Sequence, residues 1–108
     1  MLSRVDNMEC LLNKPRTWGV ITTSREKVLR VFAEVKDEFA GLLDRCILYH
    51  NTMRLEFSNG VYLIWLRPDE DVCGCRFSKA WIDSNIDETD WLRVAPMLVL
   101  AKDNITYI

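Results

Sequence analysis

The sequence predicts an α/β fold: a mixed, mainly parallel sheet between helical layers, with an inserted β-hairpin. Three observations predict it. Strand-like and helix-like segments alternate along the chain, one helix has a clear apolar face, and an Asn-Gly pair lies between two β-prone runs. Such alternation favours parallel strands joined by right-handed crossovers. The length of 108 residues, with no linker-like stretch, predicts a single domain over residues 1–108.

The first third of the chain supplies a strand and the clearest helix. Residues 3–12 have a short helical pattern, and residues 17–23 are rich in β-branched and aromatic side chains, which predicts a strand. Apolar side chains then recur at helical spacing through residues 28–39. Thr23 and Glu26 fit a capping box at the start of this helix.

A β-hairpin is predicted over residues 52–66. Two β-prone runs flank Asn59-Gly60, a pair that favours a two-residue turn with positive φ at both positions. A two-residue turn pairs the residues on either side of it and places Arg54 opposite Trp65. We therefore expect a cation–π contact between that guanidinium and that indole.

Shorter patterns complete the order of elements. Residues 46–49 and 79–83 predict short strands, the second of them apolar and buried. Residues 87–95 predict a helix with acidic side chains in its first turn, where the helix dipole favours them, and Pro96 ends or kinks it. Residues 104–108 are a last β-prone run.

Composition and charge narrow the function classes. Hydrophobic residues make up 49% of the chain and charged residues 28%, values typical of a globular protein. The net charge is −2 and the basic residues are scattered, which does not favour nucleic-acid binding. No apolar run reaches about 18 residues, so no membrane span is expected. The first residues lack the apolar stretch of a secretory signal, and we expect a cytoplasmic protein with reduced thiols.

Cysteine and histidine side chains offer two further chemistries, which the spacing does not favour. A zinc site would combine Cys73 and Cys75 with Cys10, Cys46 or His50, but no second close cysteine pair exists. A small enzyme with a Cys–His pair would draw on the same residues. The plainer interpretation is four ordinary thiols and a structural or solvated histidine.

Two groups of acidic residues invite comparison with cation sites. The run at residues 69–71 could hold a cation together with Asp83, although a loop of three acids is more often solvated. The acids at residues 87, 88 and 90 are explained by their place at a helix N-terminus.

Several short segments, taken in order, resemble the nucleotide-binding core of the large terminase subunits of tailed phages. These are P-loop ATPases that drive DNA into capsids. The segments resemble a strand-to-helix turn, a hairpin, a Gly-x-Arg-Phe approach to an acidic strand, that strand, a helix end and the next core strand. They are residues 20–26, 54–60, 74–77, 80–83, 96–98 and 105–108. The resemblance implies a truncated P-loop NTPase-like core.

The sequence departs from that family where the chemistry lies. No G-x-x-x-x-G-K-[ST] loop occurs, and this loop is what cradles the phosphates of a bound nucleotide. By the resemblance, Asp83 stands where a Mg²⁺-coordinating acid is expected. The next residue, where the family has its catalytic glutamate, is Ser84, which cannot activate a water. We therefore expect no enzyme activity, no catalytic residue and no bound cofactor.

The resulting hypothesis is a non-catalytic protein of phage or prophage origin, acting in the host cytoplasm. It would bind and modulate another protein, such as host machinery or a defence system, inhibition being one form. A core without its P-loop strand leaves an edge that needs cover, so a protein partner or self-association is expected. Trp65, Trp91 and Arg54 are the predicted contact residues. The alternative is a subunit of a split, nucleotide-dependent nucleic-acid-processing complex whose partner supplies the P-loop, with Asp83 as the metal ligand.

Overall fold

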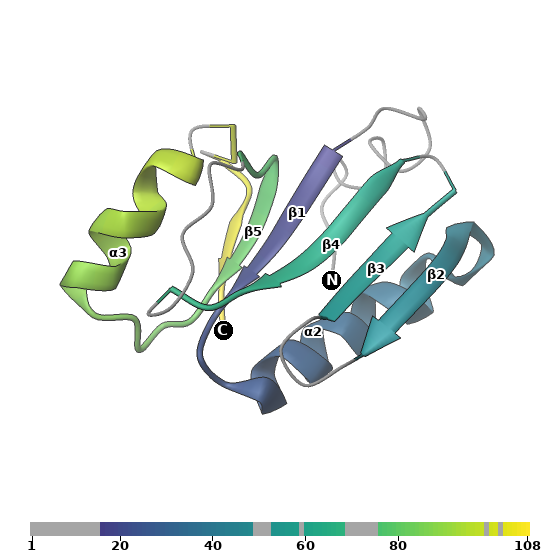
Figure 1. Ribbon diagram of the computed structural model, residues 1–108, viewed down its shortest axis with the longest axis horizontal. Helices are drawn as coiled ribbons and strands as arrows, with labels where there is room; N and C mark the ends of the chain where they lie inside the picture. Colours follow the sequence, from purple (N-terminus) through teal and green to yellow (C-terminus); the bar gives the residue numbers. More distant parts are fainter. Residues whose placement is uncertain (1–15, 49–52, 59, 69–75, 99, 102) are drawn as a thin grey trace.

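The structure is a computed structural model that describes residues 16–48, 53–58, 60–68, 76–98, 100–101 and 103–108. These residues form one six-stranded sheet with helices on its two faces (Figure 1). The predicted helix over residues 3–12 lies outside them. In chain order the elements are β1 Arg16–Ile21, α2 Arg25–Glu38, η1 Ala40–Leu42, β2 Leu43–Leu48, β3 Met53–Phe57, β4 Val61–Leu66, β5 Lys79–Ile82, α3 Glu88–Val94, η2 Ala95–Leu98 and β6 Ile105–Tyr107.

The sheet is mixed and mainly parallel, as predicted. The strand order is β2-β3-β4-β1-β5-β6, in which β1 runs parallel to both β4 and β5, and β5 runs parallel to β6. The hairpin of β3 and β4, extended by β2, adds the antiparallel part. The chain passes from β1 into α2, on one face of the sheet, and from β5 into α3, on the other face. The connections that leave these two adjacent strands therefore diverge.

The two helical layers follow from alternation along the strands. Trp18 and Val20 point to the face covered by α2, whereas Ile21 points to the face covered by α3 and η2. The buried side of α2 is Val28, Val31, Phe32 and Val35. Trp18 is fully buried, and its ring lies 6.1–6.4 Å from the rings of Phe39, Phe57 and Trp81. None of the described helices has the length and apolar character needed to cross a bilayer.

The start of α2 differs from the predicted capping box. Ser24, not Thr23, is the N-cap, and its hydroxyl oxygen accepts the main-chain N–H of Lys27 at 3.3 Å. The third helical position is therefore Lys27 rather than Glu26. This one-residue shift occurs because Thr22, at the end of β1, accepts the Ser24 main-chain N–H on its side-chain oxygen at 3.0 Å and turns the chain before the helix begins.

The register of the hairpin is one residue away from the prediction. Leu55 pairs with Leu63 and Arg54 with Ile64, so Arg54 is not opposite Trp65. The physical reason is the turn: the Gly60 N–H bonds the Phe57 carbonyl at 3.0 Å, and Gly60 has a φ of 88°. A tight turn that ends on a glycine with positive φ closes a three-residue loop, not a two-residue one.

Strand β2, the first strand of the antiparallel part, begins earlier than predicted. β2 begins at Leu43, three residues before the predicted start of this strand at Cys46. The last helix is closer to expectation, because α3 ends at Val94 and continues as the 3-10 turn that contains Pro96. Trp81 is buried, as predicted for the β5 strand.

Gly19, in the middle of β1, is required by packing. A β-carbon at Gly19 would lie 2.9 Å from the ring of Phe77, which is fully buried under the α3 layer. We expect Gly19→Ala to destabilise the protein by about 1–3 kcal/mol, because the ring must shift in a filled core. Chemical denaturation measures this loss.

Gly41 is the matched control for this prediction. A β-carbon at Gly41 meets nothing within 4 Å, and the residue is exposed. Gly41→Ala should therefore leave the free energy of unfolding within about 0.5 kcal/mol of the wild-type value. Equal effects of the two substitutions would contradict the packing account.

Candidate functional site

The divergence between β1 and β5 creates a crevice at their carboxyl ends. In open α/β sheets this is where ligands bind, because the loops leaving adjacent strands turn to opposite sides. The crevice has a volume of about 200 Å³. Its lining comes from the ends of β1 and β5, the residue Pro68 after β4, and the N-terminus of α3: Thr22, Thr23, Pro68, Asp83, Asn85, Ile86, Asp87 and Asp90.

Asp83 is the central group of the crevice. It directly follows β5 and is buried, with 8% of its surface exposed. The Thr22 hydroxyl donates to its Oδ2 at 2.6 Å, and Lys27 Nζ donates to its Oδ1 at 2.7 Å. The Asn85 main-chain N–H also donates to Oδ1, at 2.9 Å. Both carboxylate oxygens thus accept hydrogen bonds from the protein itself.

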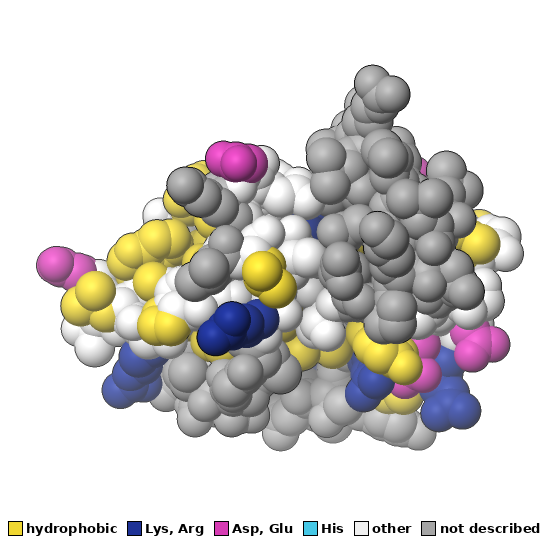
Figure 2. All heavy atoms as spheres, turned by 90° about the horizontal axis from the view of Figure 1, so that it is seen from above, with side chains coloured by type: hydrophobic (Ala, Val, Ile, Leu, Met, Phe, Trp, Pro, Cys, Tyr) yellow, Lys and Arg dark blue, Asp and Glu magenta, His cyan; other side chains and the backbone are white. Residues whose placement is uncertain are grey.

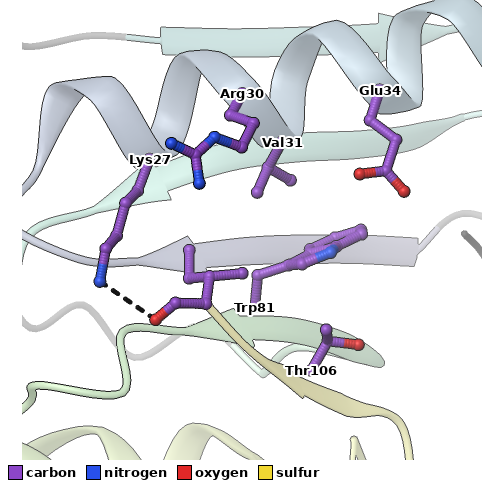
Figure 3. Close-up of a pocket in the computed structure, with 7 residues that line it drawn as sticks. Lys27, Arg30, Val31, Glu34, Trp81 and Thr106 are labelled. Carbon is purple, nitrogen blue, oxygen red and sulfur yellow. Dashed lines mark hydrogen bonds between the residues drawn. The ribbon is translucent and has the colours of Figure 1, made fainter.

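Lys27 reaches Asp83 because α2 begins immediately above the end of β1. The ammonium group is half-buried, and besides Asp83 it donates to the main-chain oxygen of Ile108 at 3.1 Å. One lysine therefore joins the helix to the residues that follow β5 and β6. The dashed line in Figure 3 marks the bond from Lys27 to Ile108. Thr22 adds the end of β1, so four elements meet at the Lys27–Asp83 ion pair.

The environment of Asp83 keeps its carboxyl ionised. Burial alone would raise the pKa of this group. The hydrogen bonds from Lys27, Thr22 and Asn85, with the positive charge of Lys27, outweigh burial and hold the pKa below its ordinary value. A carboxylate with a lowered pKa is a poor proton acceptor at neutral pH, because a general base works best with a pKa near the operating pH.

The other acids of the crevice have structural roles at the start of α3. Asp87 is the N-cap of that helix, and its side chain accepts the Asp90 main-chain N–H at 2.8 Å. This bears out the sequence-based interpretation of the acids at 87, 88 and 90. Within the part of the chain that the structure describes, no three His, Cys, Asp or Glu side chains gather as a metal-binding group.

The predicted contact residues do not share one surface. Trp65 packs against the cluster on the α2 face and Trp91 against the cluster on the α3 face, so the two indoles lie on opposite sides of the sheet. Both are half-buried, not exposed. Each ring packs at the edge of one hydrophobic cluster and is partly buried there. The Trp65 indole N–H even donates to the Thr22 main-chain oxygen, at 2.7 Å, beside the crevice.

Arg54 also has partners other than the predicted one. Its guanidinium lies 4.5 Å from the centre of the Tyr62 ring, and its Nε lies 2.9 Å from Oε2 of Glu56. The cation over Trp65 is Arg67 instead, at 5.2 Å. The shifted hairpin register explains why Arg54 is not opposite Trp65, whereas Arg67 reaches that ring from two positions further along the chain.

Most of the residues considered for thiol and metal chemistry lie outside the described residues. These are Cys10, His50, Cys73 and Cys75, together with the acidic run at 69–71. Cys46 is described and is an exposed thiol on β2.

Lys27, the residue that completes the site, was not predicted from the sequence. A signal for it existed, since an acid placed at the end of a buried strand must find a partner. Which cation it would find depends on the exact start of α2. The N-cap was predicted one residue too early, so the sequence did not show that Lys27, in the first turn of α2, reaches Asp83.

Fold and site together define an α/β protein whose switch-point crevice contains an ionised carboxylate, that of Asp83, paired with Lys27. No protein-family model, no curated protein sequence and no solved structure matches this chain.

The lowered pKa of Asp83 predicts an acid-sensitive contribution to stability. A folded-state pKa below the unfolded value of about 3.9 stabilises the protein above that pH, and the gain is lost as the pH falls through the folded-state value. We expect Asp83→Asn to be less stable than wild type by about 2–3 kcal/mol at pH 7. Urea unfolding at several pH values measures the gap, which should narrow between pH 5 and pH 2. A gap that stays constant over this range would contradict the assignment.

Proposed function

We propose that this chain is a non-catalytic protein that acts by binding another protein and modulating or inhibiting it. The observation that carries the proposal is a set of large apolar side chains exposed at the α3–β6 end of the molecule. Leu92 is 65% exposed, Leu100 59% and Tyr107 61%. Contiguous exposed apolar surface is typical of protein-binding sites.

These side chains belong to one end of the fold. Leu92 lies on α3 and Leu100 follows η2, which covers the same face of the sheet. Thr106 lines a cavity beside α2, so its neighbour Tyr107 points to the opposite face, the one that α3 covers. Figure 2 shows hydrophobic side chains gathered at the α3 end of the molecule.

The state of Asp83 also supports a binding role. Its two oxygens are engaged by Thr22, Lys27 and Asn85, and its pKa is lowered, so it is poorly suited to accept a proton from water. An origin in a phage or prophage ATPase core remains part of the proposal, on the resemblance of the sequence segments alone. Residues 74–75 of that resemblance lie outside the described part.

A second function is favoured by one specific observation, the position of Asp83 at a switch-point crevice. In this alternative the chain is one subunit of a nucleotide-dependent, nucleic-acid-processing complex, and a partner supplies the P-loop. Strand β6 is the last strand of the sheet order, so a partner strand could extend the sheet there. Mg²⁺ would then have to displace Lys27 from Asp83, and nucleotide binding would occur only in the complex.

Capture of a partner from the lysate of the cell that naturally expresses the chain tests the first function. We expect wild type to retain one protein in a stoichiometric complex and Leu92→Glu to lose it at least tenfold, because a charge would be buried in the contact. Mass spectrometry of the bound fraction measures both.

Leu48→Glu is the matched control, since Leu48 is an apolar side chain, 46% exposed, on the strand at the opposite end of the sheet. It should capture the partner as wild type does. The proposal would be contradicted if both variants lost the partner, or if the wild-type chain were recovered with no bound protein. Hydrolysis of ATP by the purified chain would do so as well.

A further inference from the structure

A second cavity lies between α2 and the β5–β6 edge of the sheet. The cluster under α2 is built on β1, β3 and β4, and takes only Trp81 from β5. The helix therefore leaves the end of this sheet face uncovered, and a cavity of about 150 Å³ remains there. Figure 3 shows its lining: Lys27, Arg30, Val31, Glu34, Trp81, Thr106 and Ile108.

The floor of this cavity is apolar and held in place. Trp81 is 4% exposed, and its ring is fixed between Trp18, at 6.1 Å, and the Lys79 ammonium, at 4.6 Å. Lys79 is itself buried and donates to the side chains of Asn104 and Thr106. Such a preformed floor loses little freedom when it is covered. A cavity of about 150 Å³ accommodates a group of the size of one benzene ring.

The roof carries two opposite charges one helical turn apart. Arg30 and Glu34 lie four positions apart on α2, and both line the cavity. In Figure 3 the Glu34 carboxylate extends toward the Trp81 ring, and the Arg30 guanidinium lies at the Lys27 end of the cavity. Among the described residues Arg30 pairs with Glu26, at 3.5 Å between two strongly exposed groups, and this contact uses few of the five N–H donors of the guanidinium. Lys27, the third charge, is committed to Asp83 and Ile108.

This arrangement corresponds to a ligand whose two charges sit together on one side of an apolar ring. We propose that the cavity binds a free aromatic α-amino acid. The α-carboxylate pairs with the Arg30 guanidinium and the α-ammonium with the Glu34 carboxylate, which has acceptor sites for more than one donor. The ring enters between Val31 and Ile108 and rests on Trp81, with the Thr106 hydroxyl at its edge. The proposal is independent of the protein-binding function.

L-Phenylalanine is the probe for a titration of the full chain, followed by calorimetry and by the indole N–H signals in ¹⁵N-labelled protein. We expect saturable binding with a dissociation constant of millimolar or below, and the largest shift at the Trp81 signal. Phenethylamine lacks the carboxylate, 3-phenylpropanoate lacks the ammonium group and glycine lacks the ring. Each should bind at least about tenfold more weakly, since each lacks one of the three contacts.

Two exposed substitutions on α2 test the roles of the charges without disturbing the core. Arg30→Gln and Glu34→Gln should each weaken L-phenylalanine binding about tenfold. Lys36→Gln, on the exposed side of the same helix, is the control and should bind as wild type does. The proposal is overturned if no saturable binding occurs up to about 10 mM, a limit set by the millimolar range expected. It is also overturned if the Arg30 and Glu34 variants bind as well as wild type, or if the shifts arise at another indole.

Discussion

The contact between Lys27 and Asp83 is the constraint on which the arrangement of this protein depends. The lysine nitrogen lies 2.7 Å from the carboxylate and also bonds the Ile108 main-chain oxygen, while Thr22 bonds the other carboxylate oxygen. The residues that follow β1, β5 and β6 are thereby tied to the first turn of α2. Removing one partner of such an ion pair destabilises a fold because it leaves the other charge unpaired. The pair thus fixes where α2 begins relative to the sheet.

The position of α2 has consequences on both sides of the pair. On one side lies the crevice between β1 and β5. Its Asp83 carboxylate is paired with Lys27 and has a lowered pKa, so it is poorly suited to act as a base at neutral pH. On the other side, the helix stops short of the β5–β6 edge and leaves the cavity with Trp81 as its floor. The exposed apolar residues Leu92, Leu100 and Tyr107 belong to the α3–β6 end of the molecule, where we propose that a partner binds.

The fold class could be predicted from the sequence because it depends on coarse periodicity, and the site could not because it depends on single-residue offsets. The apolar spacing of α2 and the buried β5 strand were recognised correctly. The hairpin register was wrong by one residue, since Gly60, with its positive φ, ends a three-residue loop. That error moved Arg54 away from Trp65. The error at the cap of α2 likewise hid Lys27. Asp83 was predicted as a metal ligand, and that role stays a prediction, whereas its partner Lys27 depends on the exact start of α2.

A double-mutant cycle between Lys27 and Asp83 tests the central claim most directly. The free energies of unfolding of wild type, Lys27→Met, Asp83→Asn and the double variant are measured at pH 7. If the pair holds the strand ends and α2 together, the sum of the two single-variant losses in the free energy of unfolding exceeds the loss in the double variant. The expected difference, the coupling energy, is about 1–3 kcal/mol. Losses that add to within about 0.5 kcal/mol would show that the two residues act independently. That result would contradict the account of the fold and of the neutralised crevice together.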